Sequence, residues 1–163
     1  MNKAVFLDRD GTINVDYGYV YKLEDLQIID KVPESLLRLA EAGFLLIIIT
    51  NQSGVGRGFF TEEAVDYFNK SLISKLSEKG VKITDVFVCI HNPDQNCDCR
   101  KPSPKLILDA IKKYDIDPTR SFMVGDKESD VLSGKKAGLI SFLLDREQDF
   151  NIITDKILKL NDE

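Results

Sequence analysis

The stretch that decides the fold is AVFLDRDGTIN, residues 4–14, an apolar run that stops at two carboxylates and a glycine. The run predicts a strand, and because alternate residues of a strand point the same way, Asp8 and Asp10 face one centre. Like charges this close need a cation or a shared proton, and a hard divalent metal such as Mg²⁺ suits oxygen ligands. Taken alone, D-x-D-G is equally typical of a polar turn after a strand.

The composition is that of a globular protein. The chain has 163 residues, of which 43% are hydrophobic and 30% charged, which fits one domain over residues 1–163. A net charge of −5 gives no overall attraction to nucleic acid or to an anionic membrane. The most apolar run, residues 44–49, is too short to span a bilayer, and no signal-peptide pattern opens the chain. We expect a soluble cytoplasmic protein without nucleic-acid or membrane partners, and a monomer by default.

Strand and helix patterns alternate along the chain. The continuous apolar run at residues 44–50 predicts a central parallel strand that is covered on both faces. Further strands are predicted at residues 4–7, 85–90, 121–126 and 139–144, and helices at 33–42, 61–80, 104–114, 127–138 and 149–163. This order predicts an α/β fold, a Rossmann-like doubly wound, mostly parallel sheet with helices on both faces. The segments between the motifs are too short for a large inserted cap domain.

Two loops follow these strands. The glycine-rich loop TNQSGVGRG, residues 50–58, can present backbone N–H groups to an anion, although it is not a Walker motif. The loop VDYGYVY, residues 15–21, has little helical periodicity and is more typical of a surface loop than of a substrate contact.

A second group of chemically distinctive residues is CIHNPDQNCDC, residues 89–99. It holds all three cysteines and the single histidine of the chain. Cys89, His91, Cys97 and Cys99 make a complete tetrahedral zinc shell with no position left for a reacting water, which predicts a structural site. Free cysteines are often small buried hydrophobes, but a loop rich in Pro, Asn and Asp is a poor place for core residues.

Charged residues follow this loop and end a later strand. Arg100 and Lys101 come directly after the last cysteine, and SFMVGD, residues 121–126, is an apolar strand that ends at an acid. Basic pairs are usually solvated surface, but arginine also offers a planar fork for a phosphate and lysine a compact charge. An acid at the carboxyl edge of an α/β sheet lies where ligands bind.

Several of these strings resemble known motifs. DRDGTIN, the strand-end Thr50, RKP and VGDK resemble the four motifs of the haloacid dehalogenase-like phosphohydrolases. Together with DYGYV, TNQSGVGRG and C-x-H-x₅-C-x-C, they cover nearly the whole chain and resemble the D-glycero-D-manno-heptose 1,7-bisphosphate phosphatases, close relatives of the histidinol-phosphate phosphatases. DYGYV and SGVGRG favour the heptose branch. Ile90 stands where relatives commonly have proline, which removes no ligand.

The resemblance implies a role for each matching residue. It makes Asp8 the nucleophile that forms an aspartyl-phosphate and Asp10 the general acid and then base, with Thr50 and Lys101 holding the phosphoryl group. Mg²⁺ is implied on Asp8, Asp126 and the main-chain carbonyl of Asp10. The implied substrate contacts are Asp16, Tyr17, Gly18, Tyr19, Asn51, Gln52, Ser53, Arg100 and Lys127. The implied reaction removes the C7 phosphate of heptose 1,7-bisphosphate.

Other functions remain open at this stage. Histidinol phosphate or another small sugar or polyol phosphate is the main competing substrate, and an open site could also admit a phosphorylated nucleic-acid end. A non-catalytic zinc-bearing interaction module would explain the cysteines but not the acids at two strand ends. A phospho-accepting receiver domain would leave Asp10 without a task and the zinc loop unexplained.

Overall fold

The computed structural model describes residues 1–145 and 147–163. Its strands are β1 (Ala4–Leu7), β2 (Leu45–Asn51), β3 (Asp85–Cys89), β4 (Phe122–Gly125) and β5 (Ile140–Leu143). Its α-helices are α1 (Val32–Glu41), α2 (Ser53–Gly56), α3 (Glu62–Glu78), α4 (Lys105–Tyr114), α5 (Glu128–Lys136) and α6 (Phe150–Asn161). The strands form one parallel sheet in the order β3-β2-β1-β4-β5. The predicted fold class is confirmed.

The sheet is buried on both faces because β1 is apolar throughout and β2 is apolar from Leu45 to Ile49. Val5 and Leu7 of β1 belong to one core cluster, and Ala4 and Phe6 belong to the other. Strand β2 divides in the same way, with Leu46 and Ile48 on one side and its two remaining buried isoleucines on the other. The uninterrupted apolar run thus reflects period-two alternation between two cores.

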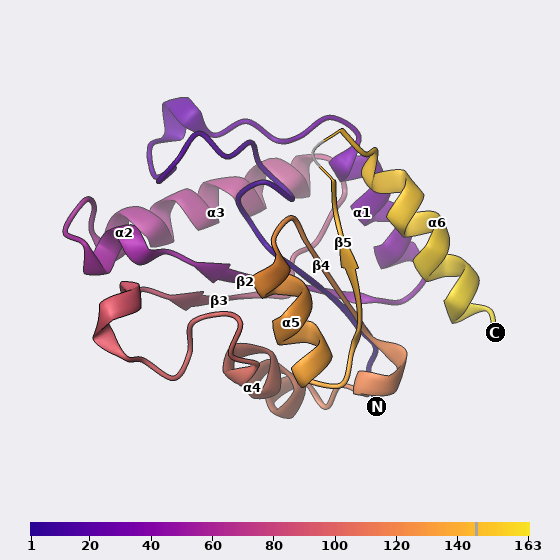
Figure 1. Cartoon of the computed structure of the whole chain (residues 1–163). Helices are drawn as coiled ribbons and strands as arrows, with labels where there is room; N and C mark the ends of the chain where they lie inside the picture. Colours follow the sequence, from indigo (N-terminus) through magenta and orange to yellow (C-terminus); the bar gives the residue numbers. More distant parts are fainter. Residues whose placement is uncertain (146) are drawn as a thin grey trace.

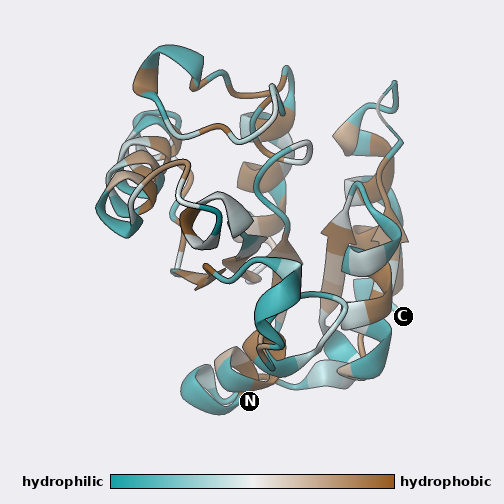
Figure 2. Cartoon of the chain, turned by 60° about the vertical axis from the view of Figure 1, so that its left-hand side comes forward, coloured by the Kyte–Doolittle hydropathy of each residue, from teal (hydrophilic) through white to brown (hydrophobic). Residues whose placement is uncertain are grey.

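Helices cover both faces of this sheet (Figure 1). Buried residues of α1, α3 and α6 pack in the first core cluster, and those of α4 pack in the second. Helix α5 lies against β4 and β5. Figure 2 shows hydrophobic residues concentrated in the strands and hydrophilic residues in many of the surrounding loops. Within the two described stretches of chain, no helix has the length and apolar composition required to cross a membrane.

The glycine-rich segment differs from its prediction. Residues Ser53–Gly56 form the short helix α2, and the N–H groups of Val55, Gly56 and Arg57 donate to main-chain carbonyls. These groups are therefore engaged within the fold rather than presented to an anion. The glycines are needed for close packing: a Cβ on Gly54 would come within 2.1 Å of the Phe60 ring, and one on Gly56 within 2.6 Å of the Asn92 nitrogen.

The sheet order brings three strand ends together. Strand β1 lies between β2 and β4, so that their carboxyl ends meet at one edge. The chain order reverses at β1, and in open α/β sheets such a switch point is where ligands bind. Asp8, Thr50 and Asp126 lie at or directly after these three ends.

Candidate active site

Asp8 lies at the floor of the site and is paired with a buried lysine. Its Oδ1 accepts a hydrogen bond from Lys101 Nζ at 2.8 Å, and both side chains are almost fully buried. Burial raises the pKa of the Asp8 carboxyl, but the Lys101 ammonium outweighs it, and the resulting pKa lies below the usual value. Asp8 is therefore an ionised carboxylate, the form that can attack phosphorus.

Lys101 is held in place by three acceptors. Its Nζ also donates to the Ile49 carbonyl at 2.8 Å and to Asp130 Oδ1 at 2.6 Å. Burial works to lower the pKa of Lys101, but the charges of Asp8 and Asp130 raise it above the usual value. The ammonium is thus a fixed positive charge beside the Asp8 carboxylate.

Asp130 supports this lysine and the loop before α5. Its side chain is 1% exposed, and its second oxygen accepts from the Lys127 main-chain N–H at 3.1 Å. With one oxygen on Lys101 and the other on the backbone, Asp130 has little capacity left for a further ligand. Sequence reasoning left the role of this residue undecided.

The donor set fits a hard divalent cation. Asp8, Asp126 and Asp130 each offer a carboxylate oxygen within 4.8 Å of the other two. Oδ1 of Asp126 is buried and has no hydrogen-bond partner among the described residues. Burial and the neighbouring Asp8 charge raise the pKa of Asp126 to about 7. A cation beside Asp8 and Asp126 would relieve this repulsion with the oxygen ligands that Mg²⁺ prefers.

Gly11 leaves room for Asp126. Its backbone has a φ of +85°, and a Cβ built there would lie 2.2 Å from Asp126 Oδ2. The glycine of the DRDG string is therefore required both for the turn and for the approach of this carboxylate.

Asp10 is surrounded by side-chain donors. Its Oδ1 accepts from Arg9 Nε at 2.8 Å and from Asn14 Nδ2 at 3.0 Å. Its Oδ2 accepts from Arg9 Nη2 at 3.1 Å and from Gln52 Nε2 at 3.2 Å. Asp10 also lines the two cavities described below. Its carboxylate is therefore fixed by neighbouring donors and is still accessible from the cavities.

The last two residues of β2 and the residue that follows connect Asp10 to the loop that carries Lys101. Gln52 Nε2 donates to Thr50 Oγ1 at 2.8 Å, and this orients the buried threonine. Asn51 Oδ1 accepts from the Lys101 main-chain N–H at 3.1 Å. The three polar residues Thr50, Asn51 and Gln52 therefore contact either each other or the catalytic candidates.

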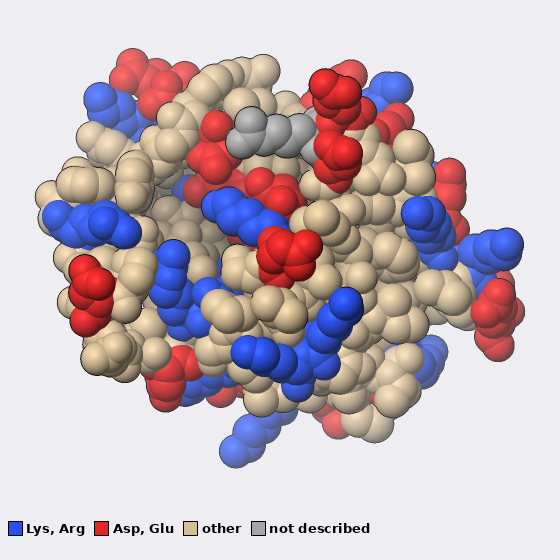
Figure 3. Space-filling view, viewed as in Figure 1, with Lys and Arg blue, Asp and Glu red and all other residues tan. Residues whose placement is uncertain are grey.

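Two adjoining cavities open at this edge of the sheet. The smaller, about 30 Å³, is lined by Asp8, Asp10, Thr50, Asn51, Lys101, Lys127, Ser129 and Asp130. The larger, about 320 Å³, is lined by Asp10, Asp16, Gly18, Tyr19, Asn51, Gln52, Ser53, Arg57, Arg100, Lys127 and Ser129. Figure 3 shows a hollow left of centre with basic and acidic side chains around it.

Arginine and lysine side chains provide the positive charge of the larger cavity. Nη1 of Arg100 is buried and lacks a hydrogen-bond partner within the described part of the chain. An unpaired buried guanidinium nitrogen needs an acceptor, and a phosphate oxygen supplies one. Arg57, which also lines this cavity, donates to Ser53 Oγ at 3.4 Å.

Three of the four residues of the loop after β1 that were predicted as substrate contacts line the larger cavity. Asp16 Oδ1 accepts from the Gly18 N–H at 2.9 Å, and the Tyr19 ring packs edge-on against Phe59 at 5.0 Å. Tyr17 is absent from the residues that line the cavity, and its hydroxyl donates to Gln27. The structure thus brings Asp16, Gly18 and Tyr19 to the cavity and turns Tyr17 elsewhere.

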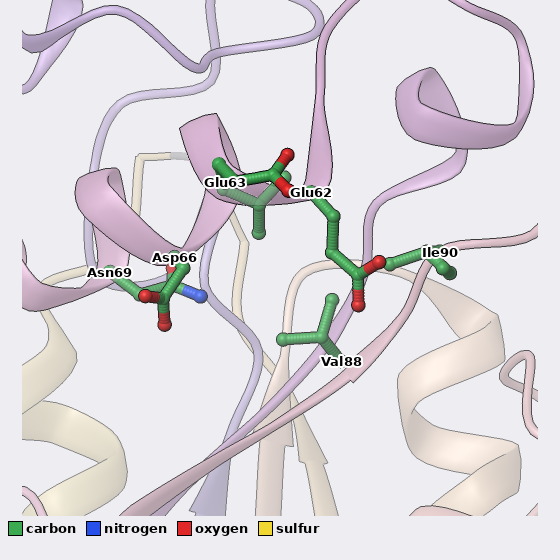
Figure 4. Close-up of a pocket in the computed structure, with 7 residues that line it drawn as sticks. Glu62, Glu63, Asp66, Asn69, Val88 and Ile90 are labelled. Carbon is green, nitrogen blue, oxygen red and sulfur yellow. The ribbon is translucent and has the colours of Figure 1, made fainter.

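A roomier cavity of about 440 Å³ lies away from these groups, between α3 and the β3 edge. Its lining residues are Glu62, Glu63, Val65, Asp66, Asn69, Val88 and Ile90 (Figure 4). The three carboxylates would repel a phosphate. Size alone therefore does not identify the active site.

The four predicted zinc ligands converge. Sγ of Cys89 lies 3.6 Å from Cys97 Sγ and 3.7 Å from His91 Nδ1, and Cys99 Sγ lies 3.4 Å from His91 Nδ1. The ligands of a tetrahedral zinc ion with bonds of about 2.3 Å are separated by about 3.8 Å. Cys89 and Cys99 approach more closely, at 2.8 Å between sulfur atoms. The donor set and the three longer separations fit zinc, whereas the Cys89–Cys99 separation is about 1 Å shorter than zinc ligation requires.

The thiols of this cluster have strongly different acidities. Burial and the Cys99 side chain raise the pKa of Cys89 to about 12. At Cys97 burial acts in the same direction, but the main-chain N–H groups of Cys99 and Arg100 outweigh it and lower the pKa to about 7. Donation from the backbone favours a thiolate at Cys97, which is the ligand form of cysteine.

Three residues near the site carry no prediction from sequence. Arg9 lies between the two motif aspartates and is completely buried, Asn69 sits on α3, and Arg57 lines the cavity. A signal for Asn69 exists, because it interrupts the apolar stripe Val65, Phe68, Leu72 and Leu76. A polar side chain on a buried helix face needs a partner.

The chain is similar to proteins of known family. The HAD-hydrolase-like family model matches residues 98–149. A D-glycero-beta-D-manno-heptose-1,7-bisphosphate 7-phosphatase from Pasteurella multocida is 44% identical over 150 residues, 88% of this chain and 82% of the relative. A D-glycero-alpha-D-manno-heptose-1,7-bisphosphate 7-phosphatase from Photorhabdus laumondii is 43% identical over 84% of this chain and 79% of the relative.

A solved structure agrees with these relatives. It is a D,D-heptose 1,7-bisphosphate phosphatase from B. bronchiseptica complexed with magnesium and phosphate. It superposes with a TM-score of 0.81 at 31% identity and covers 86% of this chain and 79% of its own. With this agreement of sequence and fold, the chain belongs to the heptose-1,7-bisphosphate 7-phosphatase family of HAD-like phosphoric monoester hydrolases.

Proposed function

We propose that this chain removes the C7 phosphate of D-glycero-D-manno-heptose 1,7-bisphosphate, with residues 1–163 acting as one phosphatase domain and as a monomer. The observation that carries the proposal is the ionised, lysine-paired Asp8, which lines the smaller cavity. That cavity shares Lys127 with the larger one, whose lining includes Arg57 and Arg100. One relative is named for the beta anomer of the heptose bisphosphate and another for the alpha anomer, and both names support the same substrate class.

Asp8 is the nucleophile in this proposal. Its free oxygen attacks phosphorus, the phosphorus–oxygen bond to C7 breaks, and an aspartyl-phosphate forms. Lys101 and Lys127 neutralise charge on the equatorial oxygens, and the Thr50 hydroxyl donates to one of them. Positioning and charge stabilisation of this kind account for most of the acceleration in phosphoryl transfer.

Asp10 transfers the protons. It donates one to the C7 oxygen as that oxygen leaves, and then takes one from the water that hydrolyses the aspartyl-phosphate, so that both groups return to their starting state. The carboxylate stands on the wall shared by the two cavities, where the leaving oxygen and the incoming water can both reach it.

Asp8, Asp126 and the main-chain carbonyl of Asp10 would hold Mg²⁺. When bound, the ion supplies charge neutralisation between the nucleophile and a phosphoryl oxygen. The buried, unpaired oxygen of Asp126 supports this assignment.

The second phosphate of the substrate accounts for the basic wall. A bisphosphate leaves one phosphate outside the reaction centre, and Arg100, with a buried nitrogen that lacks an acceptor, is suited to bind it together with Arg57. Asp16, Gly18, Tyr19, Asn51, Gln52 and Ser53 then surround the sugar. Zinc on Cys89, His91, Cys97 and Cys99 keeps the loop before Arg100 and Lys101 in one conformation.

The test is phosphate release with Mg²⁺ from both anomers of heptose 1,7-bisphosphate and from histidinol phosphate, with the Asp8→Asn variant as control. We expect kcat/KM for one heptose anomer to exceed that for histidinol phosphate by roughly 10²-fold or more. Phosphorus NMR of the product should show the C1 phosphate retained. Preference for histidinol phosphate, or equal rates for wild type and Asp8→Asn, would contradict the proposal.

A further inference from the structure

Arg9 is a completely buried arginine whose partners come from three parts of the chain. Its Nε and Nη2 hold the two oxygens of Asp10 at 2.8 and 3.1 Å. Nη1 donates to Asn69 Oδ1 of α3 at 2.9 Å, and Nη2 donates to the Val20 carbonyl, also at 2.9 Å. The guanidinium carbon lies 4.4 Å from the centre of the Phe68 ring.

Such burial is costly unless the charge has a specific set of partners. Desolvating a guanidinium costs several kcal/mol, and exact pairing is needed to offset that loss. Arg9 lines neither of the two active-site cavities, so a direct contact with substrate does not explain its charge. What the charge does reach is the carboxylate of Asp10.

The contacts give Asp10 a rigid support. A bidentate pair fixes the plane of the carboxylate as well as its distance, which a lysine cannot do. Asn69 and Phe68 anchor the guanidinium to α3, a helix of 17 residues that packs in the core. The bond to Val20 joins the same guanidinium to the loop that carries Asp16, Gly18 and Tyr19.

Asn69 is itself held in one orientation. Its oxygen faces Arg9, and Figure 4 shows its side-chain nitrogen directed into the cavity between α3 and β3. The amide therefore faces Arg9 with its acceptor and the cavity with its donor.

We propose that Arg9 is a positioning residue that sets the Asp10 carboxylate for proton transfer and couples it to the substrate loop through Val20. This inference rests on the proposed function of Asp10 as acid and base. Arg9 acts through Asp10 and touches no reacting atom.

The first test compares leaving groups in the holoenzyme with Mg²⁺. Glycerol 3-phosphate has an alkoxide leaving group that needs a proton, whereas 4-nitrophenyl phosphate does not. Arg9→Lys should lower kcat for glycerol 3-phosphate by roughly 10²-fold with a smaller change in KM. With 4-nitrophenyl phosphate, the rate of the pre-steady-state burst of 4-nitrophenol reports formation of the aspartyl-phosphate alone. In Arg9→Lys this burst rate should fall by less than about threefold if only proton donation is impaired.

The matched control is Arg38→Lys, which alters an arginine that binds Asn151 and Asp155 far from Asp10. It should leave both rates unchanged. Equal losses of both rates in Arg9→Lys would mean general loosening of the site and would overturn the proposal.

A second readout does not depend on activity. In ¹⁵N NMR the Arg9 Nε–H should exchange slowly with solvent and should shift on Asp10→Asn but not on Asp94→Asn, an exposed acid elsewhere. An unchanged signal in Asp10→Asn would overturn the proposal. If no phosphate ester is hydrolysed while this shift is present, the proposed function fails and the Arg9–Asp10 link stands.

Discussion

The active-site edge and the zinc loop both gather potential metal ligands, but they do so in opposite ways. The acids Asp8 and Asp126 follow two neighbouring strands far apart in sequence, and they border open cavities. Cys89, His91, Cys97 and Cys99 come from one short segment and contact mainly each other. A site on strand ends is rigid without a metal, whereas a site on a loop depends on its metal for shape.

The two clusters also differ in how completely their polar atoms are used. Three thiolates and one imidazole make a full tetrahedral set with no open position. At the active-site edge, Asp126 Oδ1 remains without a hydrogen-bond partner in the described chain. The unpaired Asp126 oxygen supports the assignment of the reaction to the active-site edge. The complete ligand set of the Cys/His cluster supports a structural role for that cluster.

The largest expected effect is loss of turnover in Asp8→Asn. Removing the nucleophile should lower kcat by roughly 10⁴–10⁶-fold, because no other group can form the covalent intermediate. Zinc content should be unchanged, since Asp8 is hydrogen-bonded to Lys101 and to none of Cys89, His91, Cys97 and Cys99. Steady-state kinetics and metal analysis check this, with Asp162→Asn, a change at an exposed acid after α6, as the control; substantial residual turnover would remove Asp8 from its assigned role.

The next effect concerns the zinc loop. Cys99→Ser should release the zinc, lower the melting temperature by roughly 5–10 °C and reduce kcat by about tenfold, because Arg100 and Lys101 follow the ligand directly. Asn96→Gly is the matched control, since Asn96 has a φ of +49° that glycine adopts without strain. Full stability and activity of zinc-free protein would show that the loop does not need its metal.

A smaller effect is expected for substrate selectivity. Arg100→Lys removes the planar fork but keeps the charge, so KM for the bisphosphate should rise by about tenfold while KM for 4-nitrophenyl phosphate changes little. Arg120→Lys, in an exposed turn, serves as the control. Equal changes in both KM values would indicate that Arg100 acts on the transferred phosphate instead of a second one.

The smallest effect tests the contact between helix α2 and the zinc loop, residues 89–99. Gly56→Ala should destabilise the protein by roughly 1–3 kcal/mol, because the added Cβ pushes against the zinc loop. Gly54→Ala pushes on Phe60 instead. Thermal unfolding should show losses for both variants, but only Gly56→Ala should weaken zinc retention under mild chelation; equal retention would mean that α2 and the zinc loop are independent.

Most of the fold and the position of the Cys/His cluster could be predicted from the sequence. Strands β1 and β2 were predictable because continuous apolar runs are typical of strands buried on both faces, and α1 and α3 because Pro33 and Thr61 mark their starts. The convergence of Cys89, His91, Cys97 and Cys99 was predictable because all four belong to one segment. Local spacing is enough when the chemistry is local.

The remaining features depend on contacts that spacing does not encode. The partnership of Arg9 with Asn69 joins residues in β1's loop and in α3, and nothing near Arg9 indicates it. The sequence left the role of Asp130 undecided, and only the fold brings Lys101 to it. The glycines of residues 53–58 suggested an anion loop, but close packing against Phe60 and the zinc loop explains Gly54 and Gly56.

The most direct test of the account is chemical trapping of the covalent intermediate. The Asp10→Asn variant, which should hydrolyse the aspartyl-phosphate slowly, is mixed with substrate and Mg²⁺, quenched in acid and reduced with borohydride. A phosphorylated aspartate is converted to homoserine, and peptide mass spectrometry locates it. The account predicts homoserine at position 8; reduction at another acid, or no reduction in a variant that still turns over, would contradict it.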